Sequence, residues 1–200
     1  IGQAEHQARL TEATVAIKVL QEEFSSSEEA ISLLKDETAK TQQLSHPSIV
    51  KVYSADSDGD LYYVTMELIE GETLEQIIKR NKPSGLAFKK AKIILEQLTN
   101  ALIYAHSRGV IHNDLKPSNI IFDSNGNLKV LDFGIAKHKS LDDQYAVKND
   151  SELATIGGYT PTYASPEQLK GSEASVKDDV FSFACIAYEL LSSKHPFNRV

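Results

Sequence analysis

The chain has 200 residues, of which 41% are hydrophobic and 24% are charged, and its formal net charge is −7. This length and composition are typical of a globular chain with one domain or two small lobes, and the negative charge argues against nucleic acid or an anionic membrane as the main partner. No run approaches the roughly 18 apolar residues of a membrane-spanning helix. Cys185 is the only cysteine, which excludes an internal disulfide and favours a reducing, cytoplasmic compartment.

The first predicted elements are a strand and a helix. Apolar side chains alternate along residues 15–20, which predicts a strand with Lys18 on one face. A helix should follow, and Ser26 and Glu29 fit the capping-box pattern at its start. Glu37 lies in the stripe of this helix that should face inward, where a carboxylate is costly unless it is paired. Lys18 is the obvious cation, so we predict an ion pair between Lys18 and Glu37.

Later segments turn from strand to helix. Residues 49–55 and 61–68 have the pattern of strands. Helices are predicted at residues 74–79, 86–107 and 177–192. The sequence therefore predicts an α+β chain that is β-rich in its first part and mostly helical in its second part.

A hairpin is predicted between the helices at residues 86–107 and 177–192. Asn125-Gly126 lies between two apolar runs of β type, and Asn-Gly is the strongest short-range hairpin signal. With the turn centred between these two residues, Asn119 and Asp132 fall opposite each other, with Cα atoms about 4.5–5.5 Å apart in a regular antiparallel ladder. Amide and carboxylate oxygens are hard ligands of the kind that Mg²⁺ takes. The sequence thus predicts a magnesium site at one end of the hairpin.

Charged and amide side chains that could take part in catalysis lie at one end of this hairpin. Residues 112–119 read H-N-D-L-K-P-S-N, and residues 132–134 read D-F-G. An aspartate at position 114 can hold a substrate hydroxyl in line with a phosphate, and Lys116 can neutralise charge on the transferred group. Any one of these residues alone would most simply be a solvated loop charge. The complete spacing favours metal-assisted phosphoryl transfer.

Two further stretches complete a family pattern. Residues 160–167 read T-P-T-Y-A-S-P-E, and residues 179–183 read D-V-F-S-F. With the motifs above, they resemble the catalytic loop, magnesium loop, activation segment and central C-lobe helix of eukaryotic-like (Hanks-type) Ser/Thr protein kinases. By this resemblance Asp179 would be a buried carboxylate that orients the catalytic loop, and His112 would be a structural residue packed near Phe133.

The resemblance also implies a fold and partners. It implies a bilobal protein-kinase-like α+β fold, with a partial N-lobe in residues 1–70 and a partial C-lobe in residues 71–200. It implies ATP and Mg²⁺ as cofactors and a protein substrate with a Ser or Thr acceptor, without nucleic acid and without a membrane segment in this chain. The glycine-rich phosphate loop is missing, and the chain stops soon after the last predicted helix. We therefore expect a kinase domain that is truncated at both ends.

Site roles follow from the same resemblance. Asp114 would orient the substrate hydroxyl, Lys116 would contact the γ-phosphate, and Thr160 would bond to both of them. Asn119 and Asp132 would hold magnesium. The residues expected to bind the nucleotide are Lys18 and Glu37 at the phosphates, Ala16 and Ile121 on either side of the adenine, Met66 as gatekeeper, and the backbone near Glu67 and Ile69.

Two positions depart from the family pattern. Asn113 replaces the usual arginine that receives the activation-segment phosphate, so we predict weak dependence on phosphorylation of that segment. Thr41 is polar where the regulatory spine prefers an apolar residue, and we expect it to loosen the helix that carries Glu37. Two other functions stay open: a non-catalytic kinase-like scaffold, and a small-molecule kinase of the aminoglycoside or choline type.

Overall fold

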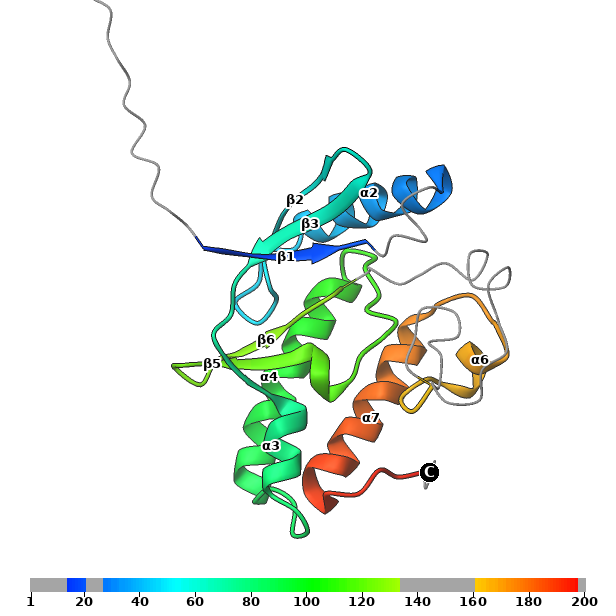
Figure 1. The fold of residues 1–200 in the computed structure, drawn as a ribbon. Helices are drawn as coiled ribbons and strands as arrows, with labels where there is room; N and C mark the ends of the chain where they lie inside the picture. Colours follow the sequence, from blue (N-terminus) through cyan, green and yellow to red (C-terminus); the bar gives the residue numbers. More distant parts are fainter. Residues whose placement is uncertain (1–13, 21–26, 134–160, 198–200) are drawn as a thin grey trace, which may run out of the picture.

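The computed structural model describes residues 14–20, 27–133 and 161–197 (Figure 1). The upper part of the ribbon is a three-stranded antiparallel sheet, in the order β1-β3-β2, with one helix against it. These elements are β1 (Val15–Val19), β2 (Val52–Asp58), β3 (Leu61–Glu67) and α2 (Glu28–Gln42).

A small apolar core lies between this sheet and α2. Val64 and Met66 are two residues apart on β3, so their side chains point to the same face of the sheet. They are buried together with Val50 and Val52, and Leu34 of α2 packs against the cluster. The alternating pattern of the strands therefore provides the surface on which α2 rests.

The start of α2 differs from the prediction. Ser27 is the N-cap, and its side chain accepts a hydrogen bond from the N–H of Ala30 at 3.2 Å. The cap predicted at Ser26 is wrong by one residue, and Ser26 itself lies outside the described residues. The hydroxyl of Ser27 satisfies one of the N–H groups that the first turn of a helix leaves without an intrahelical partner.

The lower part combines a second small sheet with helices. Its strands are antiparallel and lie in the order β4-β5-β6. The elements are β4 (Gly71–Thr73), α3 (Leu74–Arg80), α4 (Phe88–His106), the 3₁₀ turn η1 (Pro117–Asn119), β5 (Ile120–Asp123), β6 (Leu128–Val130), α6 (Pro166–Leu169) and α7 (Val176–Ser192). The α+β prediction is confirmed, with the sheet of the N-lobe above and most of the helices below.

The main core forms where α4 and α7 lie side by side (Figure 1). Leu98 and Ala101 of α4 are fully buried, and so are Ile186 and Leu190 of α7. Each pair recurs at three or four residues, the spacing that places side chains on one face of a helix. The packing of α4 against α7 forms the scaffold that holds the catalytic loop, residues 112–119.

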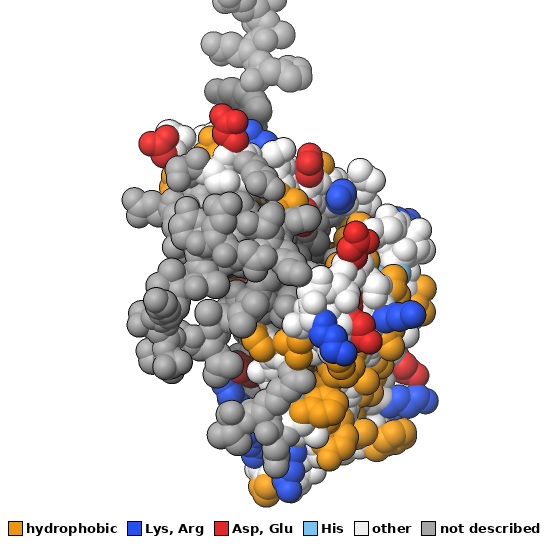
Figure 2. Space-filling model, turned by 90° about the vertical axis from the view of Figure 1, so that its right-hand side faces the viewer, with side chains coloured by type: hydrophobic (Ala, Val, Ile, Leu, Met, Phe, Trp, Pro, Cys, Tyr) orange, Lys and Arg blue, Asp and Glu red, His pale blue; other side chains and the backbone are white. Residues whose placement is uncertain are grey.

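α7 also carries apolar side chains that the described residues leave exposed. Val180, Tyr188 and Leu191 are each exposed by 43% or more. Figure 2 shows hydrophobic side chains gathered over the lower part of one face of the molecule. Within the described ranges, no helix is both long enough and apolar enough to cross a membrane.

The predicted hairpin is present, but its register differs from the prediction. Ile120 pairs with Val130, and the N–H of Leu131 donates to the carbonyl of Asn119 at 2.9 Å. Asn119 therefore lies opposite Leu131, and the predicted opposition of Asn119 and Asp132 is wrong by one residue. The two side chains still belong to adjacent rungs at the same end of the hairpin.

The turn explains the shift in register. The N–H of Asp123 donates to the carbonyl of Asn127 at 3.0 Å, so the loop holds three residues, 124–126, in place of a two-residue turn. Gly126 takes the left-handed conformation that such a loop needs, with φ of 81°. The carboxylate of Asp123 accepts hydrogen bonds from the N–H groups of Asn125 and Asn127, at 2.9 and 2.8 Å. These extra bonds favour the longer loop.

The two parts of the molecule meet at β6. The N–H of Val50 donates to the carbonyl of Val130, and the N–H of Val130 donates to the carbonyl of Ser48, both at 2.9 Å. An ion pair joins Lys129 of β6 to Glu67 at the end of β3, with distances of 2.9 and 3.0 Å from Nζ to the two carboxylate oxygens. The division of the chain between residues 70 and 71 stays a prediction.

Candidate active site

The catalytic loop is held by a buried carboxylate at the start of α7. Asp179 accepts hydrogen bonds from the backbone N–H groups of His112, at 2.8 Å, and Asn113, at 2.9 Å. Its side chain is only 1% exposed. The architectural role predicted for Asp179 is therefore confirmed.

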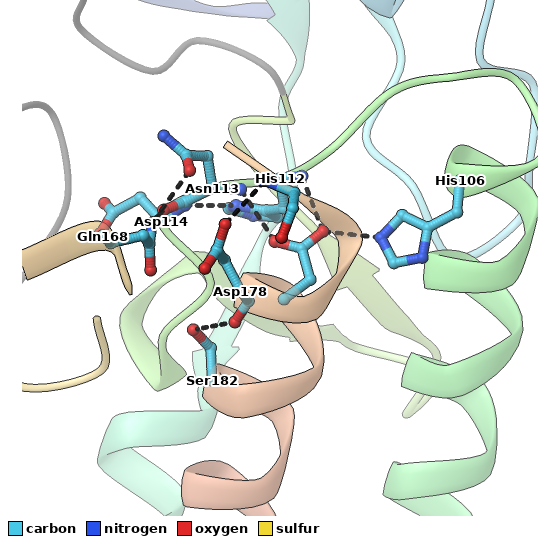
Figure 3. A network of polar contacts seen from close by, with 9 residues as sticks. His106, His112, Asn113, Asp114, Gln168, Asp178 and Ser182 are labelled. Carbon is cyan, nitrogen blue, oxygen red and sulfur yellow. Dashed lines mark hydrogen bonds and ion pairs between the residues drawn. The ribbon is translucent and has the colours of Figure 1, made fainter. Parts of the chain in front are cut away.

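A histidine from α4 completes the surroundings of this carboxylate. Nε2 of His106 lies 2.7 Å from Oδ2 of Asp179 (Figure 3). No local pattern indicates this contact, because the two residues are far apart in the chain and His106 has the spacing of an ordinary residue near a helix end. The carboxylate thus joins α4, α7 and the catalytic loop.

His112 is structural, as predicted. It is fully buried, and its ring lies 4.9 Å from the ring of Phe133, centroid to centroid. Nε2 is 2.8 Å from the carbonyl of Leu131, which can only accept, so Nε2 carries the hydrogen. Nδ1 then accepts the N–H of Asp114 at 3.3 Å. Both ring nitrogens are used to shape the backbone on either side of the site.

The two predicted catalytic side chains of this loop lie together. Nζ of Lys116 is 2.6 Å from Oδ2 of Asp114, and both side chains are mostly buried. Nδ2 of Asn119 donates to the carbonyl of Asp114 at 2.9 Å. This bond orients the amide so that Oδ1 is its atom able to bind a cation. Thr160, the third predicted catalytic residue, lies outside the described residues.

The predicted ion pair between Lys18 and Glu37 is not formed. Nζ of Lys18 lies 3.0 Å from Oδ2 of Asp132, and Glu37 makes no ion pair within the described part of the chain. Burial raises the pKa of Glu37 to about 8, against the opposing effects of Lys40 and Lys18. A carboxyl group with this pKa is mostly protonated at neutral pH, so it does not require a cation. Lys18 pairs instead with the carboxylate of Asp132.

Asn119 and Asp132 fit a magnesium ion by donor type and position. One offers an amide oxygen and the other a carboxylate, from adjacent rungs at one end of the hairpin. Among the described residues, no group of three or more His, Cys, Asp and Glu side chains could hold a metal by itself. Water and phosphate would have to complete the coordination, which is how Mg²⁺ is usually bound.

Most residues predicted to bind adenine lie at the junction of the two parts. Ala16 pairs with Met66 across β1 and β3, and Ile69 packs against the same small core. The N–H of Glu67 is already bonded to the carbonyl of Lys51 at 2.8 Å. Ile121 is half-buried on β5, opposite Lys129. The structure brings Ala16, Met66 and Ile69 together; all five nucleotide contacts remain predictions.

Comparison with known proteins gives the family. A family model described as "Protein kinase domain" matches residues 3–200. The chain belongs to the protein kinase domain family. The arrangement of Asp114, Lys116, Asn119 and Asp132 around the hairpin is thus the candidate active site of a protein kinase domain.

Several relatives of the chain are bacterial. The chain is 37% identical over 184 residues to "Serine/threonine-protein kinase PrkC" of Bacillus subtilis. The aligned region covers 92% of this chain and 27% of that protein. It is 37% identical over 189 residues to "Probable serine/threonine-protein kinase PknB" of Lactococcus lactis, covering 94% and 29%. The chain thus spans less than a third of these relatives. Among solved structures, the Mycobacterium tuberculosis PknI kinase domain shares the fold, with a TM-score of 0.72, 24% identity, and coverage of 93% of this chain and 66% of that one.

Thr41 has a role in this kinase domain that the sequence did not reveal. Its buried hydroxyl lies 2.8 Å from the carbonyl of Phe133 and 2.9 Å from the carbonyl of Glu37. Thr41, which we expected to loosen α2, therefore bonds α2 directly to the residue that follows Asp132. Only the fold could show this, because the bond to Phe133 joins residues that are 92 positions apart.

We predict that Thr41→Val destabilises the protein by about 1–3 kcal/mol, because a buried carbonyl loses its donor. Thr38→Val is the matched control: Thr38 is equally buried on the same helix, but its hydroxyl has no partner among the described residues. Removing that hydroxyl should be neutral or stabilising. Denaturant unfolding of both variants measures the difference, and equal losses would contradict the role given to Thr41.

We also predict that stability depends on pH through Glu37. Its pKa in the folded protein, about 8, is above the ordinary value of 4.5, so the folded state binds the proton more tightly. The resulting stabilisation is fully present below the unfolded pKa and is lost as pH rises through the folded one. Wild type should therefore lose stability relative to Glu37→Gln, which cannot titrate, between about pH 4.5 and pH 8. If the denaturation midpoints of wild type and Glu37→Gln change in parallel across this pH range, the prediction is refuted.

Proposed function

We propose that this domain transfers the γ-phosphoryl group of ATP to Ser or Thr hydroxyls of protein substrates. The observation that carries the proposal is the set of contacts around Asp114. Its carboxylate touches Lys116, its carbonyl orients Asn119, and Asn119 lies one rung from Asp132. A hydroxyl acceptor, a phosphate and a cation could each meet a suitable side chain there.

The residues would divide the work as follows. Asp114 accepts the hydrogen of the substrate hydroxyl and holds its oxygen in line with the phosphorus. Lys116 places a positive charge beside the phosphoryl group as it moves. Asn119 and Asp132 would hold Mg²⁺, which when bound supplies charge neutralisation at the phosphate oxygens. Positioning and electrostatics of this kind account for most of the catalysis in phosphoryl transfer.

Lys18 would change partner during this cycle. It now balances the charge of Asp132 at 3.0 Å. A cation bound by Asp132 would take over that role, and Lys18 could then turn to the phosphates and to Glu37. Ala16, Met66, Ile69, Ile121 and the backbone of Glu67 would contact the adenine.

A nucleotide-binding scaffold is the second candidate function. The pairing of Lys18 with Asp132, in place of Glu37, favours it. The two functions differ in one experiment: a scaffold would be stabilised against heat by ATP and Mg²⁺ but would transfer no phosphate to a peptide. A small-molecule kinase is less compatible with the T-P-T-Y-A-S-P-E segment, which resembles a peptide-docking element. A cytoplasmic location stays a prediction from the sequence.

We predict that Asp132→Asn lowers phosphotransfer to a peptide by about 100-fold or more, because metal coordination contributes several kcal/mol to stabilisation of the transition state. Asp123→Asn changes a carboxylate at the other end of the same hairpin and should leave the activity as it is. Radiolabelled phosphate transfer from ATP measures both variants. Equal activity of wild type and Asp132→Asn would exclude the magnesium role.

We also predict that activity depends little on phosphorylation of the activation segment, because Asn113 cannot bind a phosphate as arginine does. Alanine at Ser151, Thr155 and Thr162, singly and together, should leave phosphotransfer close to wild type in the full-length protein. Treatment with a phosphatase before the assay provides an independent comparison. A collapse of activity in either arm would show that a charge-based switch is present after all.

A further inference from the structure

Gln168, in α6, reaches the residue that precedes Asp114. Its Nε2 donates to the carbonyl of Asn113 at 2.8 Å and to Oδ1 of the same residue at 2.9 Å. Its Oε1 accepts the N–H of Ser165 at 2.9 Å. Gln168 as a whole is 3% exposed, and Figure 3 shows it next to Asn113. A residue that follows the predicted activation loop is thus bonded to the catalytic loop.

Hydrogen-bonding chemistry allows only one orientation for this amide. The N–H of Ser165 can only donate, so it requires the oxygen of the Gln168 side chain. The carbonyl of Asn113 can only accept, so it requires the nitrogen. Oδ1 of Asn113 faces the same nitrogen and accepts as well. The three partners agree, and together they fix both side-chain amides.

Asparagine is well suited to position 113. Its φ is 68°, in the left-handed region that asparagine tolerates better than most residues. Its side chain offers an acceptor to Gln168, whereas an arginine has only donors. Its N–H is taken by Asp179 at 2.9 Å. Asn113 is therefore held through its N–H, its carbonyl and its side chain, and the peptide that leads into Asp114 is fixed.

α6 is tied to the same end of α7 that holds the catalytic loop. Oγ of Ser165 donates to Oδ1 of buried Asp178 at 2.5 Å. Oδ2 of Asp178 accepts the N–H of Ser175 at 2.7 Å. The next residue, Asp179, binds the catalytic loop. The contacts thus form a closed set. Asp178 of α7 binds Ser165 at the start of α6, Gln168 of α6 binds Asn113, and Asn113 binds Asp179 of α7.

We propose that Gln168 is a positioning residue: the Gln168–Asn113 amide pair locks the catalytic loop onto α6 and so sets the place of Asp114. This neutral lock does the work that an arginine at position 113 and a negatively charged phosphate would otherwise share. The inference rests on the proposed phosphoryl transfer and gives that site a specific mode of regulation. The arrangement of the catalytic loop is built into the fold and does not wait for a charge to be added.

The variant that isolates this lock is Gln168→Glu. A glutamate keeps the oxygen that accepts the N–H of Ser165, because Glu and Gln both serve in a capping box. It loses the two donors to Asn113. The matched control is Gln76→Glu: Gln76 occupies the same capping-box position in α3, where its Oε1 accepts the N–H of Thr73 at 2.8 Å, and it is exposed.

In the full-length protein, we expect Gln168→Glu to lower kcat with a peptide substrate by about tenfold or more, because two partly buried acceptors on Asn113 lose their donor. The KM for ATP should stay close to wild type, since the nucleotide contacts are untouched. Gln76→Glu should change neither constant. Wild-type kcat in a folded Gln168→Glu variant, or an equal fall in the Gln76→Glu control, would overturn the proposal.

Hydrogen exchange supplies a second readout that needs no activity. The amides of residues 112–115 should exchange faster in Gln168→Glu and unchanged in Gln76→Glu. If Gln168→Glu does not fold, Asn113→Gly replaces it, because glycine suits a φ of 68° and only the side-chain acceptor is lost; it should show a smaller change in the same direction. A wild type without phosphotransfer would contradict the proposed function, while unchanged exchange in the variants would contradict the lock.

Discussion

The catalytic side of this molecule depends on one buried charge, the carboxylate of Asp179. Removing a carboxylate from water is costly unless hydrogen bonds replace its hydration. Here the replacement comes from the N–H groups of His112 and Asn113 and from the ring of His106, and the first turn of α7 adds a favourable dipole. These donors belong to the catalytic loop and α4. Any movement of the loop away from α7 would deprive this buried carboxylate of two hydrogen bonds, and that cost holds the loop in place.

The other side of the site is governed by competition for one cation. Lys18 can balance Asp132 or Glu37, and the structure pairs it with Asp132. Burial raises the pKa of Glu37 and keeps its carboxyl group mostly neutral, so Glu37 does not need Lys18 as a counter-ion. Lys18 is thereby in a position to exchange partners when another positive charge reaches Asp132. Asp179 supplies a rigid half of the site, and Lys18 supplies a half that can respond to ligands.

The sequence predicted what depends on local pattern and missed what depends on distant partners. Helical and strand periodicity located α4, α7, β1 and β3, and the motif spacing located Asp114, Lys116, Asn119 and Asp132. The hairpin register was wrong by one residue because Asn-Gly was taken for a two-residue turn, whereas bonds from the side chain of Asp123 favour a loop of three. The partners of Lys18, Thr41 and His106 could not be read from the sequence at all. Each is chosen by the way that separate elements pack, and no local spacing encodes that.

Thr41 and Gln168 show a common principle in how this site is held. Each donates from a neutral side chain to a backbone carbonyl next to a functional residue: Thr41 to Phe133, beside Asp132, and Gln168 to Asn113, beside Asp114. A neutral hydrogen bond is short-ranged and directional, so it fixes a peptide plane without adding charge to a site that we propose to hold phosphates and a cation. Ion pairs in the same places would compete with Lys18 and Lys116 for the carboxylates. Neutral donors therefore allow the two loops to be rigid while the charged side chains remain able to change partners.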